Sequence, residues 1–216
     1  MNKDTLKVIE IYQSIQGESS LTGIPCTFVR LAGCPLRCKW CDTVYSFEGG
    51  AFLTLAEIVA QVQALAPRTV ELTGGEPLAQ TQTNQLAEMF VAQGFKVMIE
   101  TSGSEPIEFL PKETHIVMDV KCPGSGMSSK NKLGNLQHLK PTDDLKFVVA
   151  SQEDFDWSCK FVQEHKLENK VNLLASPAFG HVDPKDLVTW ILSAPVTFRL
   201  NLQIHKYIWG PRVKGV

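Results

Sequence analysis

The sequence lacks a long apolar run, a strong excess of either charge, and any second cysteine-rich or histidine-rich motif. No stretch approaches the ~18 apolar residues that a membrane-spanning helix needs. Met1–Ser20 has alternating apolar residues but no uninterrupted apolar segment like that of a signal peptide. The formal net charge of −2 argues against a basic nucleic-acid surface. We therefore expect a cytoplasmic protein that binds neither membranes nor nucleic acid.

The chain also shows no internal repeat, no low-complexity segment and no linker rich in proline, glycine or serine that would divide it. Its 216 residues, 44% of them hydrophobic and 20% charged, are enough for one domain with a sizeable core. We expect a single domain spanning residues 1–216.

Short apolar, β-branched runs alternate with helical patterns along the chain. The expected strands are Thr27–Leu31, Val70–Thr73, Lys96–Glu100, Ile116–Val120, Leu145–Val149, Val171–Ala175 and Thr197–Leu202. The expected helices are Leu55–Leu65, Gln82–Gln93, Glu153–Lys166 and Pro184–Leu192. Thr54 with Glu57 resembles a capping box, and Asp183 precedes a proline at a first helical position.

The alternation predicts βα units and a mainly parallel sheet, hence an α/β fold. The expected helix is missing or degraded between Ser102 and His115 and again from Pro123 to Asp143. Ordinary surface loops and a partial barrel with trimmed helices both fit this pattern.

Three cysteines, Cys34, Cys38 and Cys41, have the spacing C-x₃-C-x₂-C, and no fourth follows in the same loop. Iron–sulfur clusters are normally held by four thiolates. Three thiolates would leave one iron of a [4Fe–4S] cluster open to a ligand, and an open metal position usually indicates chemistry. The loop follows a predicted strand, where α/β folds place their active sites.

Other interpretations of the cysteines remain. A fourth ligand from elsewhere in the chain would make a closed zinc or electron-transfer site, and six cysteines also permit disulfides. Zinc sites usually show two separated ligand pairs, and no second pair is present. The other cysteines are Cys26, Cys122 and Cys159; the first and last of these resemble small buried hydrophobes.

A second informative segment, Thr73–Pro77, reads Thr-Gly-Gly-Glu-Pro and directly follows a predicted strand. Two glycines at a strand end let a ligand approach the backbone closely. A sharp turn would need the same residues, so the segment is a weak signal by itself.

Together, the two segments resemble the radical S-adenosylmethionine (SAM) superfamily. The resemblance implies a [4Fe–4S] cluster on Cys34, Cys38 and Cys41, with its open iron bound to the amino and carboxylate groups of SAM. It also implies cleavage of SAM to a 5′-deoxyadenosyl radical that abstracts hydrogen from the substrate. Trp40 would shield the cluster; a simple packing role fits it equally well.

Further segments are similar to the 7-carboxy-7-deazaguanine synthase family, in the expected order over essentially the whole chain. They are Tyr12–Glu18, Thr22–Pro25, Phe28–Leu31, Trp40–Thr43, Glu100–Gly103 and Leu202–Tyr207. The resemblance implies a partial (β/α) barrel of about six parallel strands. It implies a Mg²⁺-dependent ring contraction of 6-carboxy-5,6,7,8-tetrahydropterin to 7-carboxy-7-deazaguanine with loss of ammonia, in queuosine and 7-deazapurine biosynthesis. A homodimer and an electron donor such as flavodoxin are also implied.

The same resemblance assigns the site residues. Substrate contacts are expected from Ile15, Gln16, Gly17, Glu18, Arg30, Thr73, His205 and Pro211, with the Arg30 fork suited to a carboxylate. Cofactor contacts are expected from Trp40, Cys41, Asp42, Gly75, Glu76, Ser102, Asp119, Val120, Lys121, Ser176, Pro177, Ala178 and Phe179. Thr43 is the expected protein ligand of Mg²⁺, with water and substrate oxygens completing the octahedron.

This chain departs from the family pattern in four places. Ser19 stands where a glycine is common, Asp119–Lys121 replaces Ser-Pro-Lys, and Ser176-Pro177 replaces Gln-Pro. Some members end near the position of Pro211 and use the terminal carboxylate in the substrate pocket. Here the sequence continues to Val216, so either residue is expected to approach the substrate.

Two rival functions remain from the sequence. A glycyl-radical enzyme activase shares the cysteine spacing and small size but acts on a partner protein. A non-catalytic iron–sulfur or zinc protein would need a fourth ligand.

Overall fold

The computed structural model describes residues 4–216, so the first three residues of the expected domain lie outside the described part. One nine-stranded sheet runs through that part in the order β3-β1-β2-β4-β5-β6-β7-β8-β9. The strands are β1 Thr5–Ile15, β2 Pro25–Leu31, β3 Ala51–Thr54, β4 Thr69–Gly74, β5 Lys96–Thr101, β6 His115–Asp119, β7 Asp144–Val149, β8 Asn172–Pro177 and β9 Arg199–Leu200.

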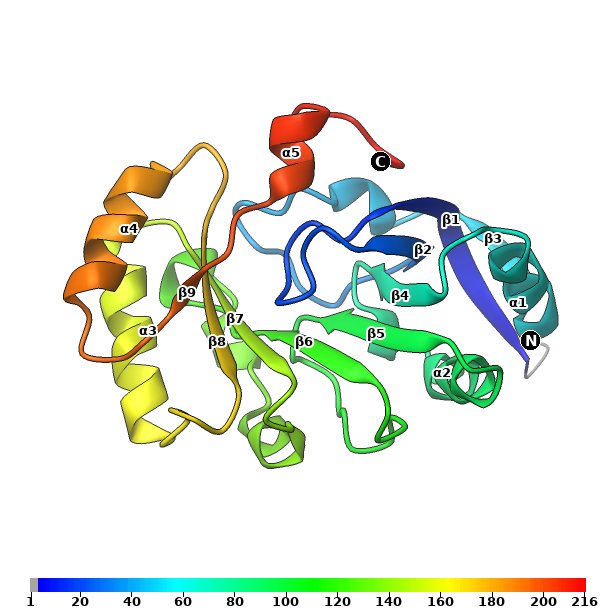
Figure 1. The fold of residues 1–216 in the computed structure, drawn as a ribbon, viewed down its shortest axis with the longest axis horizontal. Coiled ribbons are helices and arrows are strands. Elements are labelled where there is room, and N and C mark those ends of the chain that lie inside the picture. Colours follow the sequence, from blue (N-terminus) through cyan, green and yellow to red (C-terminus); the bar gives the residue numbers. More distant parts are fainter. Residues whose placement is uncertain (1–3) are drawn as a thin grey trace.

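The sheet is an open, mostly parallel barrel. Strands β2 and β4 to β9 pair in parallel, while β1 pairs antiparallel with both β2 and β3. Strands β3 and β9 end the sheet and do not pair with each other, so the arch seen in Figure 1 stays open. The α/β fold and the partial barrel of about six parallel strands are therefore confirmed. The antiparallel β1 and β3 were not among the expected strands.

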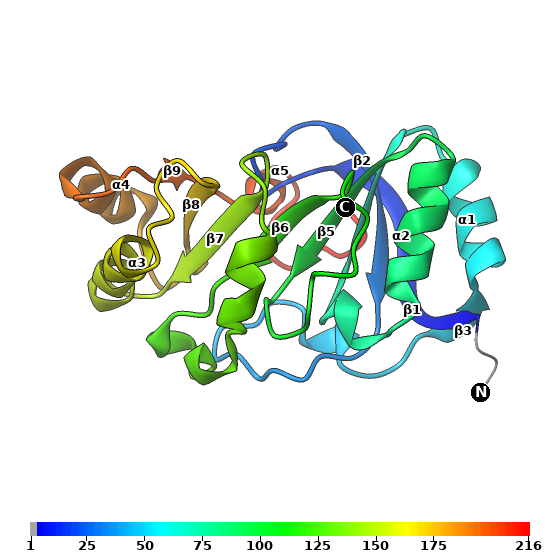
Figure 2. The same ribbon diagram turned by 90° about the horizontal axis from the view of Figure 1, so that it is seen from below.

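Four helices cover the outer face of this arch (Figures 1 and 2), and a fifth lies over its open side. Their bounds are α1 Leu55–Gln63, α2 Thr83–Ala92, α3 Gln152–Glu164, α4 Pro184–Ser193 and α5 Ile204–Ile208. The capping box of α1 is present: the Thr54 hydroxyl accepts from the Glu57 amide and the Glu57 carboxylate accepts from the Thr54 amide. The Asp183 side chain caps α4. Helix α5 was not expected.

The two connections without an expected helix are confirmed as trimmed. No helix is described between β5 and β6, and β6–β7 carries three 3₁₀ segments, Pro123–Ser125, Ser128–Lys130 and Leu133–His138. The Asn135 side chain ties these connections together: its amide donates to the carbonyls of Gly103 and Glu105. A buried side-chain amide thus satisfies backbone groups that a helix would otherwise have paired.

The core fills the space between the sheet and the outer helices. Phe147 of β7 is fully buried, with its ring 5.8 Å from the rings of both Phe161 and Phe198 in edge-on contact. Leu72 and Ile99, on β4 and β5, are also fully buried. The helices cover the outer, apolar face of the sheet. The carboxyl ends of the parallel strands are not covered in this way, and a cavity lies there. Among residues 4–216, no helix is long and apolar enough to cross a membrane.

A cavity at the carboxyl ends of the strands

A cavity of about 730 Å³ opens at the carboxyl ends of the parallel strands. Its walls come from the β1–β2 loop, the cysteine loop, the strand ends, α5 and the last seven residues. The predicted site residues in its lining are Ile15, Gln16, Gly17, Glu18, Arg30, Cys34, Cys38, Trp40, Cys41, Asp42, Thr43, Thr73, Gly75, Ser102, Asp119, Lys121, Ala178, Phe179, His205 and Pro211. Residues that are distant in sequence and were expected to share one site therefore line the same cavity.

Three cysteines face this cavity as free thiols. Cys34, Cys38 and Cys41 all line it and are half-exposed, whereas the other three cysteines are buried and absent from its lining. A side chain of the loop holds its backbone in place: the Arg37 guanidinium donates to the carbonyls of Cys34 and Leu36. Burial raises the pKa of the Cys34 and Cys38 thiols, so binding of iron would displace protons from them.

The donor set fits a cluster with three protein ligands. No three His, Cys, Asp or Glu side chains within residues 4–216 lie close enough together to hold a single metal ion. In a [4Fe–4S] cluster each thiolate binds a different iron, so its ligands are spread more widely than those of one zinc ion. All six cysteines are free, which also counts against the disulfide interpretation.

The glycine segment packs directly against the start of the cysteine loop. The Glu76 amide donates to the Gly33 carbonyl at 2.8 Å, and the Gly75 amide donates to the Leu31 carbonyl at 3.3 Å. A Cβ atom on Gly75 would lie 2.3 Å from the Gly33 oxygen and 2.7 Å from the Cys34 Cβ. The contact leaves no room for a side chain.

The Glu76 side chain turns away from the cavity. Its carboxylate is fully buried and accepts hydrogen bonds from the amides of Leu78 and Ser102 and from the hydroxyls of Thr101 and Ser102. Burial raises its pKa, against the lowering effect of these hydrogen bonds. The carboxylate thus joins the ends of β4 and β5 and leaves the preceding glycine backbone to face a ligand. Three further predicted contacts, Val120, Ser176 and Pro177, also lie outside the cavity lining.

Asp119 offers a free acceptor for a polar ligand. One of its carboxylate oxygens, Oδ2, accepts from Lys121 Nζ at 2.7 Å, while Oδ1 is buried without a hydrogen-bond partner. Burial alone would lower the pKa of Lys121, but the charge of Asp119 raises it, so the pair is ionic. A buried acceptor with no donor fits a hydroxyl or amino group of SAM.

The opposite wall is a chain of acids bridged by one lysine. Lys146 is buried and donates to Glu18 Oε2 at 3.0 Å and to Glu100. Burial by itself raises the pKa of Glu18, but Lys146, His205 and Gln203 lower it to about 2. Burial lowers the pKa of Lys146, while Glu100 and Glu18 raise it well above its ordinary value. The wall therefore carries fixed charges.

Glu71 lies next to this wall and has a raised pKa. Burial and the nearby charge of Glu100, with which it shares a hydrogen bond, raise its pKa well above the ordinary value. The Gln16 amide also donates to Glu71, at 3.2 Å, and Gln16 Oε1 accepts from the amides of Glu18 and Ser19. The Gln16 side chain therefore shapes the loop that presents Glu18.

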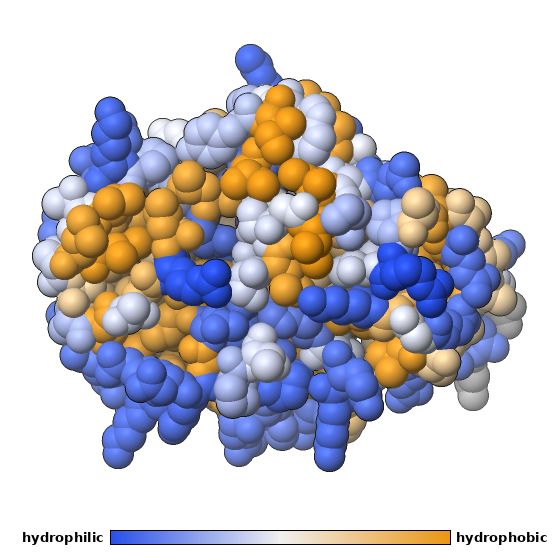
Figure 3. Space-filling model, viewed as in Figure 1, coloured by the Kyte–Doolittle hydropathy of each residue, from blue (hydrophilic) through white to orange (hydrophobic). Residues whose placement is uncertain are grey.

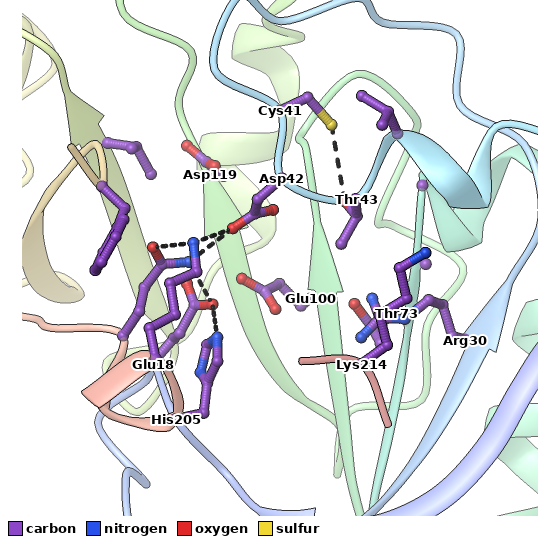
Figure 4. A pocket seen from close by; sticks show the side chains of 18 of the residues that line it. Glu18, Arg30, Cys41, Asp42, Thr43, Thr73, Glu100, Asp119, His205 and Lys214 are labelled. Atoms are coloured by element: carbon purple, nitrogen blue, oxygen red, sulfur yellow. Dashed lines mark hydrogen bonds and ion pairs between the residues drawn. The ribbon is translucent and has the colours of Figure 1, made fainter. Parts of the chain in front are cut away.

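Arg30 lies on the other side of the cavity (Figure 4), on β2. Its Nε donates to Glu10 Oε1 at 2.7 Å and its Nη2 donates to the Tyr12 hydroxyl at 3.0 Å. The Tyr45 hydroxyl donates to the same Glu10 oxygen at 2.9 Å. These contacts fix the guanidinium plane at the edge of the cavity.

The comparisons with known proteins agree with this geometry. Residues 28–118 match the model of the radical SAM superfamily. A 7-carboxy-7-deazaguanine synthase of Koribacter versatilis (strain Ellin345) is 47% identical, over 98% of this chain and all of the relative. The chain belongs to the 7-carboxy-7-deazaguanine synthase family.

Another 7-carboxy-7-deazaguanine synthase, from Chlorobaculum tepidum, is 40% identical over 98% of this chain and 97% of its own length. The crystal structure of QueE from Escherichia coli superposes with a TM-score of 0.76, covering 92% of this chain and 94% of that one, at 22% identity. This structural likeness supports the fold. Membership of both the superfamily and the 7-carboxy-7-deazaguanine synthase family is therefore confirmed.

Gly74 and Val216, which the sequence also indicated, line the cavity too. The cavity of this family member also holds residues that the sequence did not indicate. They are Tyr12, Phe28, Leu36, Val44, Tyr45, Phe47, Glu71, Glu100, Thr101, Lys146, Val148, His181, Gln203, Lys206, Gly210, Arg212, Val213, Lys214 and Gly215. The sequence did contain one signal for Lys146: it is a charged residue within a predicted buried strand, and a buried charge needs a partner. Arg212 to Gly215 had none, because an irregular segment has no periodicity.

Proposed function

We propose that this protein converts 6-carboxy-5,6,7,8-tetrahydropterin to 7-carboxy-7-deazaguanine with loss of ammonia, as a radical SAM lyase of 7-deazapurine biosynthesis. The observation that carries the proposal is the meeting of three free cysteines, a glycine strand end, an acidic wall and the Arg30 guanidinium in one cavity. The family membership supports the same reaction. When bound, the [4Fe–4S] cluster and SAM supply the radical that removes hydrogen from the substrate.

The protein residues bind and orient around that chemistry. Cys34, Cys38 and Cys41 would hold the cluster, and the Gly74-Gly75 backbone with Asp119 would hold SAM. Trp40, whose ring centroid lies 6.1 Å from that of His181, would limit access of water to the cluster. The acidic wall around Glu18 and Glu100 suits the N–H groups of a pterin ring, because carboxylates are strong acceptors of hydrogen bonds from such groups.

Thr43 is the residue we assign to Mg²⁺. Its hydroxyl lines the cavity, 3.7 Å from the Cys41 sulfur. The neighbouring Asp42 carboxylate is engaged by Lys206 and Gln203 instead. A single protein oxygen fits Mg²⁺, which keeps several waters and takes substrate oxygens.

The remaining assignments concern organisation and partners. Residues 1–216 would act as one domain, and a small electron-transfer protein such as flavodoxin would reduce the cluster. A homodimer is supported by apolar side chains exposed over α4 and α5 (Figure 3), among them Leu192 at 82% and Ile208 at 54% exposure.

The deciding experiment is anaerobic reconstitution with iron and sulfide, followed by incubation with SAM, reductant, Mg²⁺ and the carboxypterin. Mass spectrometry should detect 7-carboxy-7-deazaguanine, and the Cys38→Ala variant should yield none. SAM cleavage that a polypeptide stimulates and the pterin does not would instead identify an activase. A normally loaded cluster that yields no deazapurine would overturn the proposal.

A further inference from the structure

The cavity has a second cation beside Arg30, carried by the last seven residues of the sequence, Gly210–Val216, here called the tail. All seven tail residues line the cavity. Figure 1 shows the tail leaving α5 and passing over the open side of the barrel toward β1 and β2. The tail contains Arg212 and Lys214 and no acidic side chain. It therefore brings two basic side chains to the mouth of the cavity.

Lys214 and Arg30 lie against the same aromatic ring. Lys214 Nζ is 4.1 Å from the centroid of the Tyr45 ring, and the Arg30 guanidinium carbon is 5.8 Å from it. Figure 4 places Lys214, Arg30 and Thr73 together on one side of the cavity, with Glu18 and His205 on the other. The two cations thus share one corner of the site.

Arg30 alone leaves that corner close to neutral. Its charge is balanced by Glu10, which lies 2.7 Å away with 22% of its side chain exposed. Lys214 has no acidic side chain within 4.0 Å among the ion pairs of the described residues. The set of Arg30, Glu10 and Lys214 therefore has one unbalanced positive charge, which an anion would neutralise.

The acidic wall repels an anion from the other side of the cavity. Glu18 and Glu100 share one lysine, Lys146, and the His205 imidazole lies 3.9 Å from Glu18; with that imidazole neutral, this side has excess negative charge. A ligand with a carboxylate at one end and N–H groups at the other can satisfy both sides in one orientation. The reversed orientation would place like charges together, which costs binding free energy.

We propose that Lys214 is a specificity-determining residue that binds the substrate carboxylate together with Arg30. The proposal rests on the proposed function, because it takes the carboxypterin as substrate. It concerns a tail residue that approaches the ligand from outside the barrel, whereas Arg30 approaches from β2.

The test compares Lys214→Met, which keeps the length of the side chain and removes its charge, with Lys214→Arg and wild type. Calorimetry on the reconstituted enzyme with SAM measures Kd for 7-carboxy-7-deazaguanine and for the same deazapurine with a carboxamide in place of the carboxylate. Lys214→Met should weaken carboxylate binding about tenfold, as for one lost charge-assisted hydrogen bond, and carboxamide binding less than about twofold. Lys214→Arg should stay within about threefold of wild type.

Steady-state kinetics gives a second readout. Lys214→Met should raise KM for the carboxypterin about tenfold and leave kcat within about twofold, as expected for uniform binding. The exposed Lys160 on α3 provides the matched control, because Lys160→Met removes the same charge far from the cavity and should change neither constant.

The outcomes separate the two proposals. A wild-type enzyme that makes the deazapurine, with a Lys214→Met variant that binds the carboxylate equally well, would overturn the role of Lys214 and leave the function standing. Equal weakening of the carboxylate and the carboxamide would also overturn it, because the tail would then act through shape. A loaded wild-type enzyme that neither binds nor makes the deazapurine would overturn both.

Discussion

Gly75 and Cys34 are in such close contact that a methyl group cannot separate them: a Cβ atom on Gly75 would stand 2.7 Å from that of Cys34. One residue belongs to the strand end that faces SAM and the other to the loop that faces the cluster. The contact makes the two binding sites a single rigid junction.

Replacing Gly75 with alanine should therefore displace the cysteine loop. We expect reconstituted iron per chain to fall to less than about half and SAM cleavage to fall at least about tenfold, since misplacement by about 1 Å is costly in catalysis. The measurements are iron and sulfide analysis and the rate of SAM cleavage. Gly134→Ala is the control, because no atom lies within 4 Å of a Cβ there. Equal iron content in both variants would contradict the argument.

Substitution of a cavity cysteine should remove the cluster, whereas substitution of a buried cysteine should not. Cys38→Ala should abolish the absorbance of the cluster, because one of three ligands is lost. Cys122→Ala should keep it and lower the free energy of unfolding by about 1 kcal/mol, since a fully buried side chain is shortened. Loss of cluster in Cys122→Ala would indicate a fourth protein ligand.

Thr43→Ala should keep the cluster and impair the response to magnesium. The concentration of Mg²⁺ at half-maximal activity should rise about tenfold or more, because a ligand oxygen is removed. Thr43→Ser should restore the wild-type response. An unchanged magnesium titration in Thr43→Ala would refute the assignment.

Glu18 should stabilise the fold at neutral pH and lose that effect in acid. Its pKa is lowered from 4.5 to about 2, so its contribution is present above 4.5 and declines as the pH falls toward 2. Glu18→Gln should lower the free energy of unfolding by about 2 kcal/mol at pH 7 and by less at pH 4. Urea denaturation at both pH values tests this, with exposed Glu113→Gln as control.

The effect of Glu71 on the pH dependence of stability should be opposite to that of Glu18. Its raised pKa means that the folded protein holds a proton which the unfolded chain releases, so stability falls as the pH rises above the ordinary value of 4.5. Glu71→Gln should remove this loss and make the urea midpoint less dependent on pH between 5 and 8. Glu88→Gln, at an exposed residue of α2, is the matched control. A variant with undiminished pH dependence would show that Glu71 is charged.

The sequence predicted the parallel strands and outer helices because buried runs and capping signals are local. Thr54 and Glu57 show this, since they stand three residues apart and cap the same helix end. Strand β1 was not predicted because only Leu6 and Val8 of its residues are buried, so no continuous apolar run marks it. The direction of the Glu76 side chain could not be predicted, because Thr101 and Ser102 fix it from another strand.

The charges of the cavity walls escaped prediction for the same reason. Lys146 sits 128 residues from Glu18 and 46 from Glu100, so their meeting depends on the curvature of the whole sheet rather than on any local pattern. Within the tail only Pro211 and Val216 were indicated, by the family resemblance; Lys214 has no regular structure from which its position could be inferred.

Asp42, in the cysteine loop, is held by Gln203 and Lys206, which follow it by 161 and 164 residues. While the chain is being synthesised, its three thiols emerge from the ribosome long before these partners do. A nascent polypeptide thus has the three thiols before it has the side chains that hold Asp42, so this part of the site is complete only once α5 has been made.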